Sequence, residues 1–433
     1  MYQNWVDASR IRPSGNGDIW AVDHTAHPLL DPGFGTRRSR VLALTRQKYH
    51  RILTDDDAYR RELSRLFQPG GEEELPLARL AERAADYLNE ADVYLASTIE
   101  LLPSAARPHV LPLPAVADCD DVRGLLTMAF RADDPRLAYE ARRKLFLGQA
   151  LLRIDQSRHV QNGQLHMEHF EHLLNEGLWR HTSQVHDLEV GFRMDEGGSI
   201  AYTARPAEGD QRWHFRSTFV QAREAGRAIA LDILYYSCRF KRSVTPVTFE
   251  IVDGRRRVIE RIRWSEMRQQ TSGSILSKMI RNGINNPDTI ADMIGAMFIV
   301  HDNDALDDLL LMLDAAVGTP FGWRNVTDTL SPEKGVSLNE FSSGQFKVFK
   351  GDVDVLFPDP ATGQPYRFPV EVQIYTLEAY LRTVCGAHEA SHLALKLRQF
   401  LYGLVPRIFP REVYGSAWLE GDDGAADGPR GGL

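Results

Sequence analysis

The sequence predicts an α+β protein, in which a mainly helical N-terminal region precedes a C-terminal mixed β-sheet flanked by helices. Three observations favour this class. Apolar residues recur at three- and four-residue intervals over 72–102, which is the period of an amphipathic helix. Apolar and polar residues alternate over 189–218, as they do in antiparallel strands. A strand, a helix and two further strands then follow in order over 287–376.

The composition is that of a soluble protein. The chain has 433 residues, enough for two or three domains of about 100–200 residues each. Its net charge of −8 argues against a broad basic surface for nucleic acid. No apolar run approaches the ~18 residues that cross a bilayer, and the first residues lack a secretion signal. We therefore expect a cytoplasmic protein that does not enter a membrane. Cys119, Cys238 and Cys385 lie too far apart in sequence for a metal knuckle, and we expect free thiols.

We expect three regions along the chain. Residues 1–243 form the mainly helical N-terminal region, with a β-meander near 189–218 and a helix over about 219–240. Its role and any protein partner are unknown. Residues 244–418 form the C-terminal domain, which opens with a hairpin over 247–264 that turns at Asp253-Gly254. Residues 419–433 have too few apolar side chains to offset their ordering entropy, so we expect disorder there.

A candidate phosphate-binding element begins the C-terminal domain after its hairpin. Residues 267–283 read as a loop that opens a helix, on which Ser274 and Lys278 are four residues apart and share a face. Arg268 precedes them. Free N–H groups at a helix N-terminus can hold a polyphosphate together with a hydroxyl and two cations. The alternative is an ordinary amphipathic helix that begins with a capping serine.

Two carboxylates stand out further on. Asp292 directly precedes the buried strand 293–300, and Glu371 lies in the middle of the strand 369–376. Because side chains alternate between the two faces of a strand, Glu371 must face water or a cleft while its valine neighbours face the core. The strand 342–357 and a Pro- and Gly-rich turn come just before this strand, so we expect the two strands to be antiparallel neighbours.

The segments "SGSILSKM", "IADMIGAMFIV" and "VEVQIYT", in this order over about 265–380, resemble the synthetase domain of the RelA/SpoT family of (p)ppGpp synthetases. The motifs of that family read R-x-K-x-x-x-S-I-x-x-K, D-I-x-G-x-R, a G-Y-R-x-x-H loop and E-I-Q-I-R-T. The resemblance implies a nucleotidyltransferase-like fold. It also implies Mg²⁺-dependent transfer of the β,γ-pyrophosphate of ATP to the 3′-hydroxyl of GDP or GTP.

Position by position, the resemblance implies a role for each matching residue. Arg268, Ser274 and Lys278 would hold the ATP phosphates. Asp292 would bind the metal, and Glu371 would join it or deprotonate the acceptor hydroxyl. The acceptor nucleotide would contact Phe346, Lys347 and Gln373.

The chain departs from the family motifs at three positions that normally carry a cation. Gln270 replaces the lysine of R-x-K, Met297 replaces the arginine after "DMIG", and Tyr375 replaces the arginine of "IRT". Each charged hydrogen bond contributes ~1.5–3 kcal/mol, so either other cations compensate for these losses or the substrate differs. Four arginines that share one face of the hairpin are candidates for this role, namely Arg255, Arg257, Arg261 and Arg263. The alternative is that this face is simply exposed to solvent.

A second carboxylate set competes for the metal. Asp352 and Asp354 share a face of the strand 342–357, next to Glu371 on the adjacent strand. This set resembles the D-x-D pattern of the wider nucleotidyltransferase superfamily, and such oxygen ligands suit Mg²⁺. Both hypotheses include Glu371 as a metal ligand. For the other ligand we favour Asp292 over the Asp352/Asp354 pair.

Other functions stay open. The acceptor could be tRNA, as for toxic relatives of the family, or the domain could be an inactive nucleotide sensor. In "HMEHFEH", His166, His169 and His172 recur every three residues, which fits either a polar helix face or a metal site.

Overall fold

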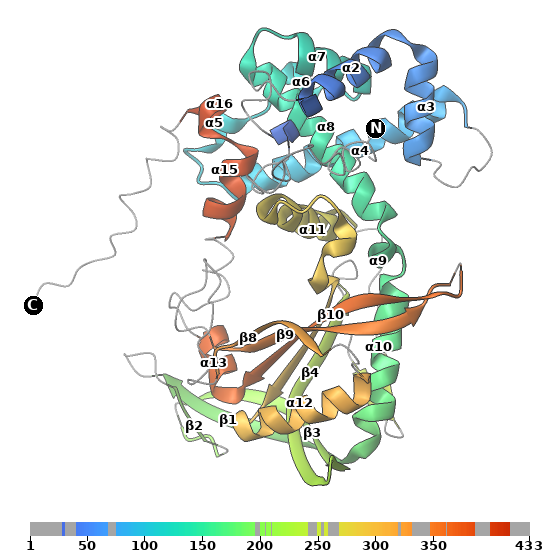
Figure 1. The fold of residues 1–433 in the computed structure, drawn as a ribbon. Helices are drawn as coiled ribbons and strands as arrows, with labels where there is room; N and C mark the ends of the chain where they lie inside the picture. The colour runs from blue at the N-terminus through green and yellow to red at the C-terminus, as the bar shows by residue number, and fades with distance from the viewer. Residues whose placement is uncertain are drawn as a thin grey trace, which may run out of the picture. The chain divides into compact units, whose positions relative to one another are not determined.

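The computed structural model in Figure 1 describes most of the chain. The described residues are 28–30, 40–67, 75–194, 200–203, 205–208, 210–240, 249–252, 255–258, 268–318, 322–330, 347–360, 362–385 and 399–415. They form an α+β structure, as the sequence predicts. In this part of the chain, no helix is both long enough and apolar enough to cross a membrane.

The chain folds into two compact units, each assembled from separate segments. The helical unit comprises Met1–Gln156, Ser272–Pro287 and Leu401–Leu433, and the sheet unit comprises Ser157–Thr271 and Asp288–Phe400. The described helices of the first unit are η1 (Pro28–Leu30), α2 (Arg40–Thr54), α3 (Asp56–Phe67), α4 (Leu77–Glu100), α5 (Arg107–Val110), α6 (Pro114–Ala117), α7 (Val122–Arg131), α8 (Pro135–Gln156), α15 (Val405–Ile408) and α16 (Arg411–Tyr414). Helix α11 (Arg268–Asn282) belongs to this unit from Ser272 onward.

Helix α8 is the centre of the helical unit, because it is buried along most of its length. It packs against α4, α6, α7 and α16. Gly148 lets α4 approach closely, since a Cβ there would lie 3.2 Å from the backbone oxygen of Tyr87. The buried stretch carries four charged residues, and a buried charge is tolerated only when it has bonded partners. The four are Glu140, Arg142, Arg143 and Lys144.

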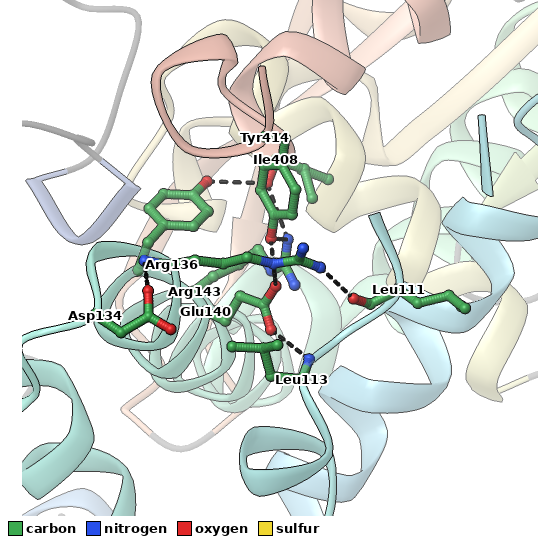
Figure 2. A network of polar contacts seen from close by, with 9 residues as sticks. Leu111, Leu113, Asp134, Arg136, Glu140, Arg143, Ile408 and Tyr414 are labelled. Carbon is green, nitrogen blue, oxygen red and sulfur yellow. Dashed lines mark hydrogen bonds and ion pairs between the residues drawn. The ribbon is translucent and has the colours of Figure 1, made fainter. Parts of the chain in front are cut away.

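Figure 2 shows how Glu140 finds its partners. Its carboxylate, which is fully buried, accepts hydrogen bonds from the Leu113 N–H at 2.6 Å, from Arg136 Nε at 2.8 Å and from the Tyr414 hydroxyl at 3.0 Å. Arg143 donates to that hydroxyl at 2.6 Å and to the Ile408 carbonyl at 3.2 Å. We call these residues the Glu140 network. It attaches residues 408–414 to α8.

Helix α11 is held inside the helical unit by contacts of its own. The Ser277 and Tyr94 hydroxyls form a hydrogen bond of 2.8 Å, and Arg407 donates to the Ile280 carbonyl at 3.4 Å. Ile275, Leu276, Met279 and Ile280 are buried. The helix expected over 267–283 is therefore present, and its apolar face belongs to the core of this unit.

The sheet unit is built on one eight-stranded sheet with the order β2-β1-β3-β4-β7-β10-β9-β8. Strands β7 and β10 pair in parallel, whereas the other neighbours are antiparallel. The strands are β1 (Thr182–Met194), β2 (Ile200–Thr203), β3 (Gln211–Glu224), β4 (Arg227–Phe240), β7 (Ile294–Val300), β8 (Trp323–Asp328), β9 (Phe349–Pro358) and β10 (Pro365–Thr376). A separate hairpin pairs β5 (Phe249–Val252) with β6 (Arg255–Val258).

One face of the central strands packs against two helices, α10 (Gly163–Gly177) and α12 (Asn303–Val317). Val370, Val372 and Ile374 of β10 are buried in the same apolar cluster as Leu309 of α12 and Phe170 of α10. The unit also contains α9 (Arg158–Gln161), α13 (Leu377–Cys385) and the short helices η2 (Trp179–His181), η3 (Pro287–Thr289) and η4 (Ala291–Met293). The expected antiparallel pairing of the last two strands is confirmed by β9 and β10.

The helix expected over 219–240 is wrong, because these residues form the end of β3 and all of β4. The two strands turn at Ala225 and Gly226, both with positive φ (49° and 81°), as in a two-residue hairpin turn. Alanine, glutamate and arginine favour a helix here, but pairing with β3 and β7 overrides that propensity. The sheet therefore crosses the boundary that we expected at residue 243. Residues 253–254 and the tail 419–433 lie outside the described residues.

The Glu140 network predicts a large effect on stability. Glu140→Ala removes the ion-pair partner of Arg136 and the acceptor of the Leu113 N–H and of the Tyr414 hydroxyl. Breaking such a buried charge network costs about 3–5 kcal/mol of unfolding free energy. Tyr414→Phe removes only hydroxyl bonds and should cost about 1–3 kcal/mol. Urea unfolding followed by circular dichroism measures both. Glu82→Ala removes an exposed pair with Arg79 on α4 and should change little. Equal losses for Glu140→Ala and Glu82→Ala would contradict this account.

Candidate active site

The alternation of β10 puts its polar side chains on the face opposite to α10 and α12. Val370, Val372 and Ile374 face the apolar core, so Glu371 and Gln373 face the other side. Glu371 is nevertheless only 7% exposed. A carboxylate this buried has to be surrounded by polar groups.

The pairing of the strands aligns charged residues in one row across the sheet. Arg239 of β4 pairs with Gly295 of β7, which pairs with Glu371 of β10. Glu371 pairs with Asp352 of β9, and Asp352 pairs with Arg324 of β8. Directly paired residues point to the same face. We call these five residues the charged row; it has two acids at its centre and an arginine at each end.

Gly295 leaves an opening in the charged row between Arg239 and Glu371. A Cβ built on Gly295 would meet no atom of the described residues within 4 Å. Glu371 is its neighbour on one side and Arg239 is its neighbour on the other. Arg239 is exposed and has no bonded partner among the described residues. The row therefore offers open space between a carboxylate and an unpaired guanidinium.

Glu371 is held by neighbours on its own face. Lys350 of β9 forms an ion pair with one carboxylate oxygen, and the Gln373 amide donates to the other at 2.6 Å. The Tyr375 hydroxyl donates to Oε1 of the Gln373 side-chain amide at 3.3 Å. This second bond orients the amide so that its NH₂ group faces Glu371. The carboxylate is thus fixed from two sides.

Electrostatic effects link the acids of this face. Burial raises the pKa of Asp352, and the nearby Glu371 and Asp292 carboxylates add to the rise, against the Asn325 hydrogen bond of 2.7 Å. Burial alone would lower the pKa of Lys350, but the negative charge of Glu371 raises it. Asp292 lies in η4, just before β7, and acts on both groups. The Asp292 and Glu371 carboxylates therefore both lie near Asp352 and Lys350.

The donor set at this place fits Mg²⁺. Carboxylate oxygens are its preferred ligands, and Mg²⁺ usually needs only one or two of them together with substrate phosphates and water. Among the described residues, no three His, Cys, Asp or Glu side chains already form a metal cluster. Asp292 and Glu371 are the two carboxylates that the sequence predicts for such a site.

The rival pair, Asp352 and Asp354, is engaged by β8. Arg324 forms an ion pair with Asp354, which is 6% exposed, and Asn325 donates to Asp352. The two aspartates share a face of β9, as expected from the sequence. Asp354 thus has a cationic partner on the neighbouring strand, as Glu371 has in Lys350.

The remaining predicted residues lie in different parts of the structure. Ser274 and Lys278 are on α11 of the helical unit, and Arg268 begins that helix. Phe346 is outside the described residues, as are Arg261 and Arg263 of the expected cationic hairpin face. Lys347 does not lie in the charged row; it lines a pocket with Thr376, three residues beyond Gln373. Gln373 itself contacts Glu371.

Sequence reasoning missed Arg239, Lys350, Arg324 and Asn325. The family motif gives no signal for Arg239, because its R-x-K aligns with Arg268 and Gln270. Residues 219–240 are also predicted as a helix, so the sequence does not place Arg239 on a strand. The other three residues flank the aspartates through cross-strand pairing, which the sequence does not show.

The expected polar helix face at 166–172 is wrong for His166. This side chain is 1% exposed, stacks on Phe368 with ring centroids 4.2 Å apart, and bonds the Tyr366 hydroxyl. Burial, reinforced by His159 and His169 nearby, lowers the pKa of His166 to about 3. The neutral imidazole is therefore part of an aromatic cluster against β9 and β10. The Nε2 of His169 forms a hydrogen bond of 3.0 Å with the backbone carbonyl of Leu356.

Comparisons with known proteins give weak similarities. No family model and no curated protein matches this chain. Among solved structures, small alarmone synthetase 1 from Bacillus subtilis bound to its product pppGpp is 18% identical, with a TM-score of 0.21 over 35% of this chain and 70% of that chain. Another structure of the same synthetase is 17% identical, with a TM-score of 0.24 over 45% and 78%. A GTP pyrophosphokinase family protein from Streptococcus pneumoniae is 16% identical, with a TM-score of 0.22 over 40% and 66%. TM-scores this low do not establish that this chain shares their activity.

The raised pKa of Asp352 predicts a pH effect on stability. The folded state binds the proton of Asp352 more tightly than the unfolded chain, whose aspartates have a pKa of about 3.9. The contribution of Asp352 to the free energy of unfolding therefore falls as the pH rises from about 4 through the raised pKa of this group. Asp352→Asn removes this titration, so the variant should gain stability relative to wild type across that window. Urea midpoints measured from pH 3.5 to 7 test this, and a constant difference between the two proteins would refute it.

Proposed function

We propose that the charged row is a phosphotransfer site, which moves the β,γ-pyrophosphate of ATP to the 3′-hydroxyl of GDP or GTP with the help of Mg²⁺. The observation that carries this proposal is the convergence of Asp292 and Glu371 beside the open space over Gly295, with the unpaired Arg239 on the other side. The order of the three sequence motifs supports the same activity. The predicted roles of Arg268, Ser274, Lys278 and Phe346 stay predictions.

Each group of the row has a chemical task in such a transfer. The acceptor oxygen bonds to the β-phosphorus while the bond from that phosphorus to the oxygen of the α-phosphate breaks, and AMP leaves. Glu371 accepts the hydroxyl proton, and Gln373 keeps the carboxylate oriented while it does so. Arg239 and Lys350 balance charge on the phosphate oxygens. When bound to Asp292 and Glu371, Mg²⁺ neutralises further charge on the triphosphate.

A second function, nucleotide sensing without catalysis, is favoured by one observation. Lys350 forms an ion pair with Glu371, the group that should act as the base. A base neutralised in this way accepts a proton poorly until the lysine moves to a phosphate. If Lys350 stays on Glu371 when nucleotide binds, the site binds nucleotide but does not turn it over.

The test of transfer is thin-layer chromatography of the full chain with γ-labelled ATP and Mg²⁺, offering GDP, GTP, ADP or tRNA in turn. Label on one acceptor with wild type identifies the reaction and its acceptor. Glu371→Gln keeps the shape but cannot accept a proton, so the rate should fall by about 10²–10⁴. Nucleotide binding with no labelled product from any acceptor would refute catalysis and leave the sensor.

Arg239 gives an independent prediction on the same strand. Arg239→Gln removes one charged hydrogen bond to phosphate, which is worth ~1.5–3 kcal/mol, so kcat/KM for ATP should fall by about 10- to 100-fold. Arg227→Gln is the matched control, because Arg227 is also an arginine of β4 but pairs with Asp308 of α12 at 2.8 Å. Equal effects of the two substitutions would show that Arg239 does not contact the substrate.

A further inference from the structure

A polar pocket of about 200 Å³ lies at the far end of the central strands of the sheet unit. Strands β7 and β10 run in parallel and end together, where Val300 pairs with Thr376. In open sheets, ligands bind in the crevice outside the carboxyl ends of parallel strands. The charged and polar residues that matter in its lining are His301, Asp302, Lys347, Thr376, Glu378 and Arg382.

The pocket is separate from the charged row. Thr376 is five residues beyond Glu371, which is about 16 Å along an extended strand. The two residues also point to opposite faces of β10, because an odd number of positions separates them. A ligand in the pocket therefore has its own set of contacts.

The acids of the pocket already have partners. Asp302 caps α12 by accepting a hydrogen bond from the Ala305 N–H at 3.0 Å. Glu378 forms an ion pair with Arg382 Nη2 at 2.6 Å. Their negative charges are thus used within the protein, and neither carboxylate has to be neutralised by a ligand.

The cationic side chains of the pocket, by contrast, carry N–H donors that have no acceptor among the described residues. Lys347 is exposed and bonds no other group within the described part of the chain. Among the described residues Arg382 pairs with Glu378 through Nη2 alone, so its Nη1 is left to meet a ligand in the pocket that it lines. His301 adds an imidazole whose Nε2 lies 3.6 Å from Asp232. The hydrogen-bonding capacity left in the pocket is therefore that of donors, which calls for an acceptor-rich ligand.

Two helices begin at this pocket and add to its preference for negative charge. Helices α12 and α13 start at Asn303 and Leu377, and both begin beside residues of the lining. The N-terminus of a helix carries a partial positive charge and unpaired N–H groups. Together with the spare donors of Lys347 and Arg382, these termini define an anion site. We propose that the pocket binds a phosphorylated small molecule, with its phosphate between Lys347 and Arg382, at a second ligand site of the sheet unit.

The test is isothermal titration calorimetry of the full chain with inorganic pyrophosphate in EDTA, where no metal supports binding at the carboxylates and no turnover occurs. Wild type should bind one pyrophosphate per chain. Lys347→Gln and Arg382→Gln should each weaken binding by about tenfold or more, since each removes a charged donor. GDP as a second probe should lose affinity in the same two variants, because the phosphate carries the interaction.

Two controls test whether the loss of affinity is specific to the pocket. Arg227→Gln and Glu82→Ala, which change residues of neither site, should both bind pyrophosphate as wild type does. No binding by wild type would overturn the proposal, as would an equal loss of affinity in Arg227→Gln or Glu82→Ala. Because the assay measures binding without metal, its result does not depend on whether the chain transfers pyrophosphate.

Discussion

The strict alternation of β10 is the constraint on which the candidate site depends. Val370, Val372 and Ile374 have to be buried against α10 and α12, and this burial fixes Glu371 and Gln373 on the opposite face. A slip of the pairing by one residue would move the valines to the polar face and Glu371 into the apolar core. The apolar core therefore sets the register of the charged row. The parallel neighbour β7 and the antiparallel neighbour β9 then bring Gly295 and Asp352 level with Glu371. The chemistry on one face is therefore positioned by hydrophobic burial on the other.

The network around Glu371 shows how this chain differs from the motifs that it resembles. Tyr375 stands where those motifs have an arginine, and its hydroxyl donates to the Gln373 carbonyl oxygen instead of presenting a charge. Lys350, from the adjacent strand, supplies a cation next to the carboxylate. The cations of this face lie on the neighbouring strands, where Arg239, Lys350 and Arg324 are found.

The sequence predicted the fold where local patterns agree with tertiary structure. Helices α11 and α12 and strands β7, β9 and β10 each combine a clear period with capping or turn residues. Strand β4 was missed because residues such as Ala228, Ala230 and Arg227 favour a helix, and only its two neighbours in the sheet make it a strand. Because β4 was not predicted as a strand, Arg239 could not be assigned to a row that crosses several strands. Glu371 was found because its position depends on alternation alone, whereas Lys350 and Asn325 depend on cross-strand register.

The Glu140 network has a consequence for the order in which the chain folds during synthesis. The helical unit needs Ile408 and Tyr414 to satisfy the buried groups of α8, and it needs α11, whose residues lie between two segments of the sheet unit. On the ribosome, α8 emerges more than 250 residues before Tyr414, which its network requires. While the sheet is being made, Glu140 therefore lacks its bond from Tyr414, and Arg143 lacks both Tyr414 and Ile408. A chaperone that shields these helices until residue 414 leaves the exit tunnel would protect the incomplete unit from aggregation.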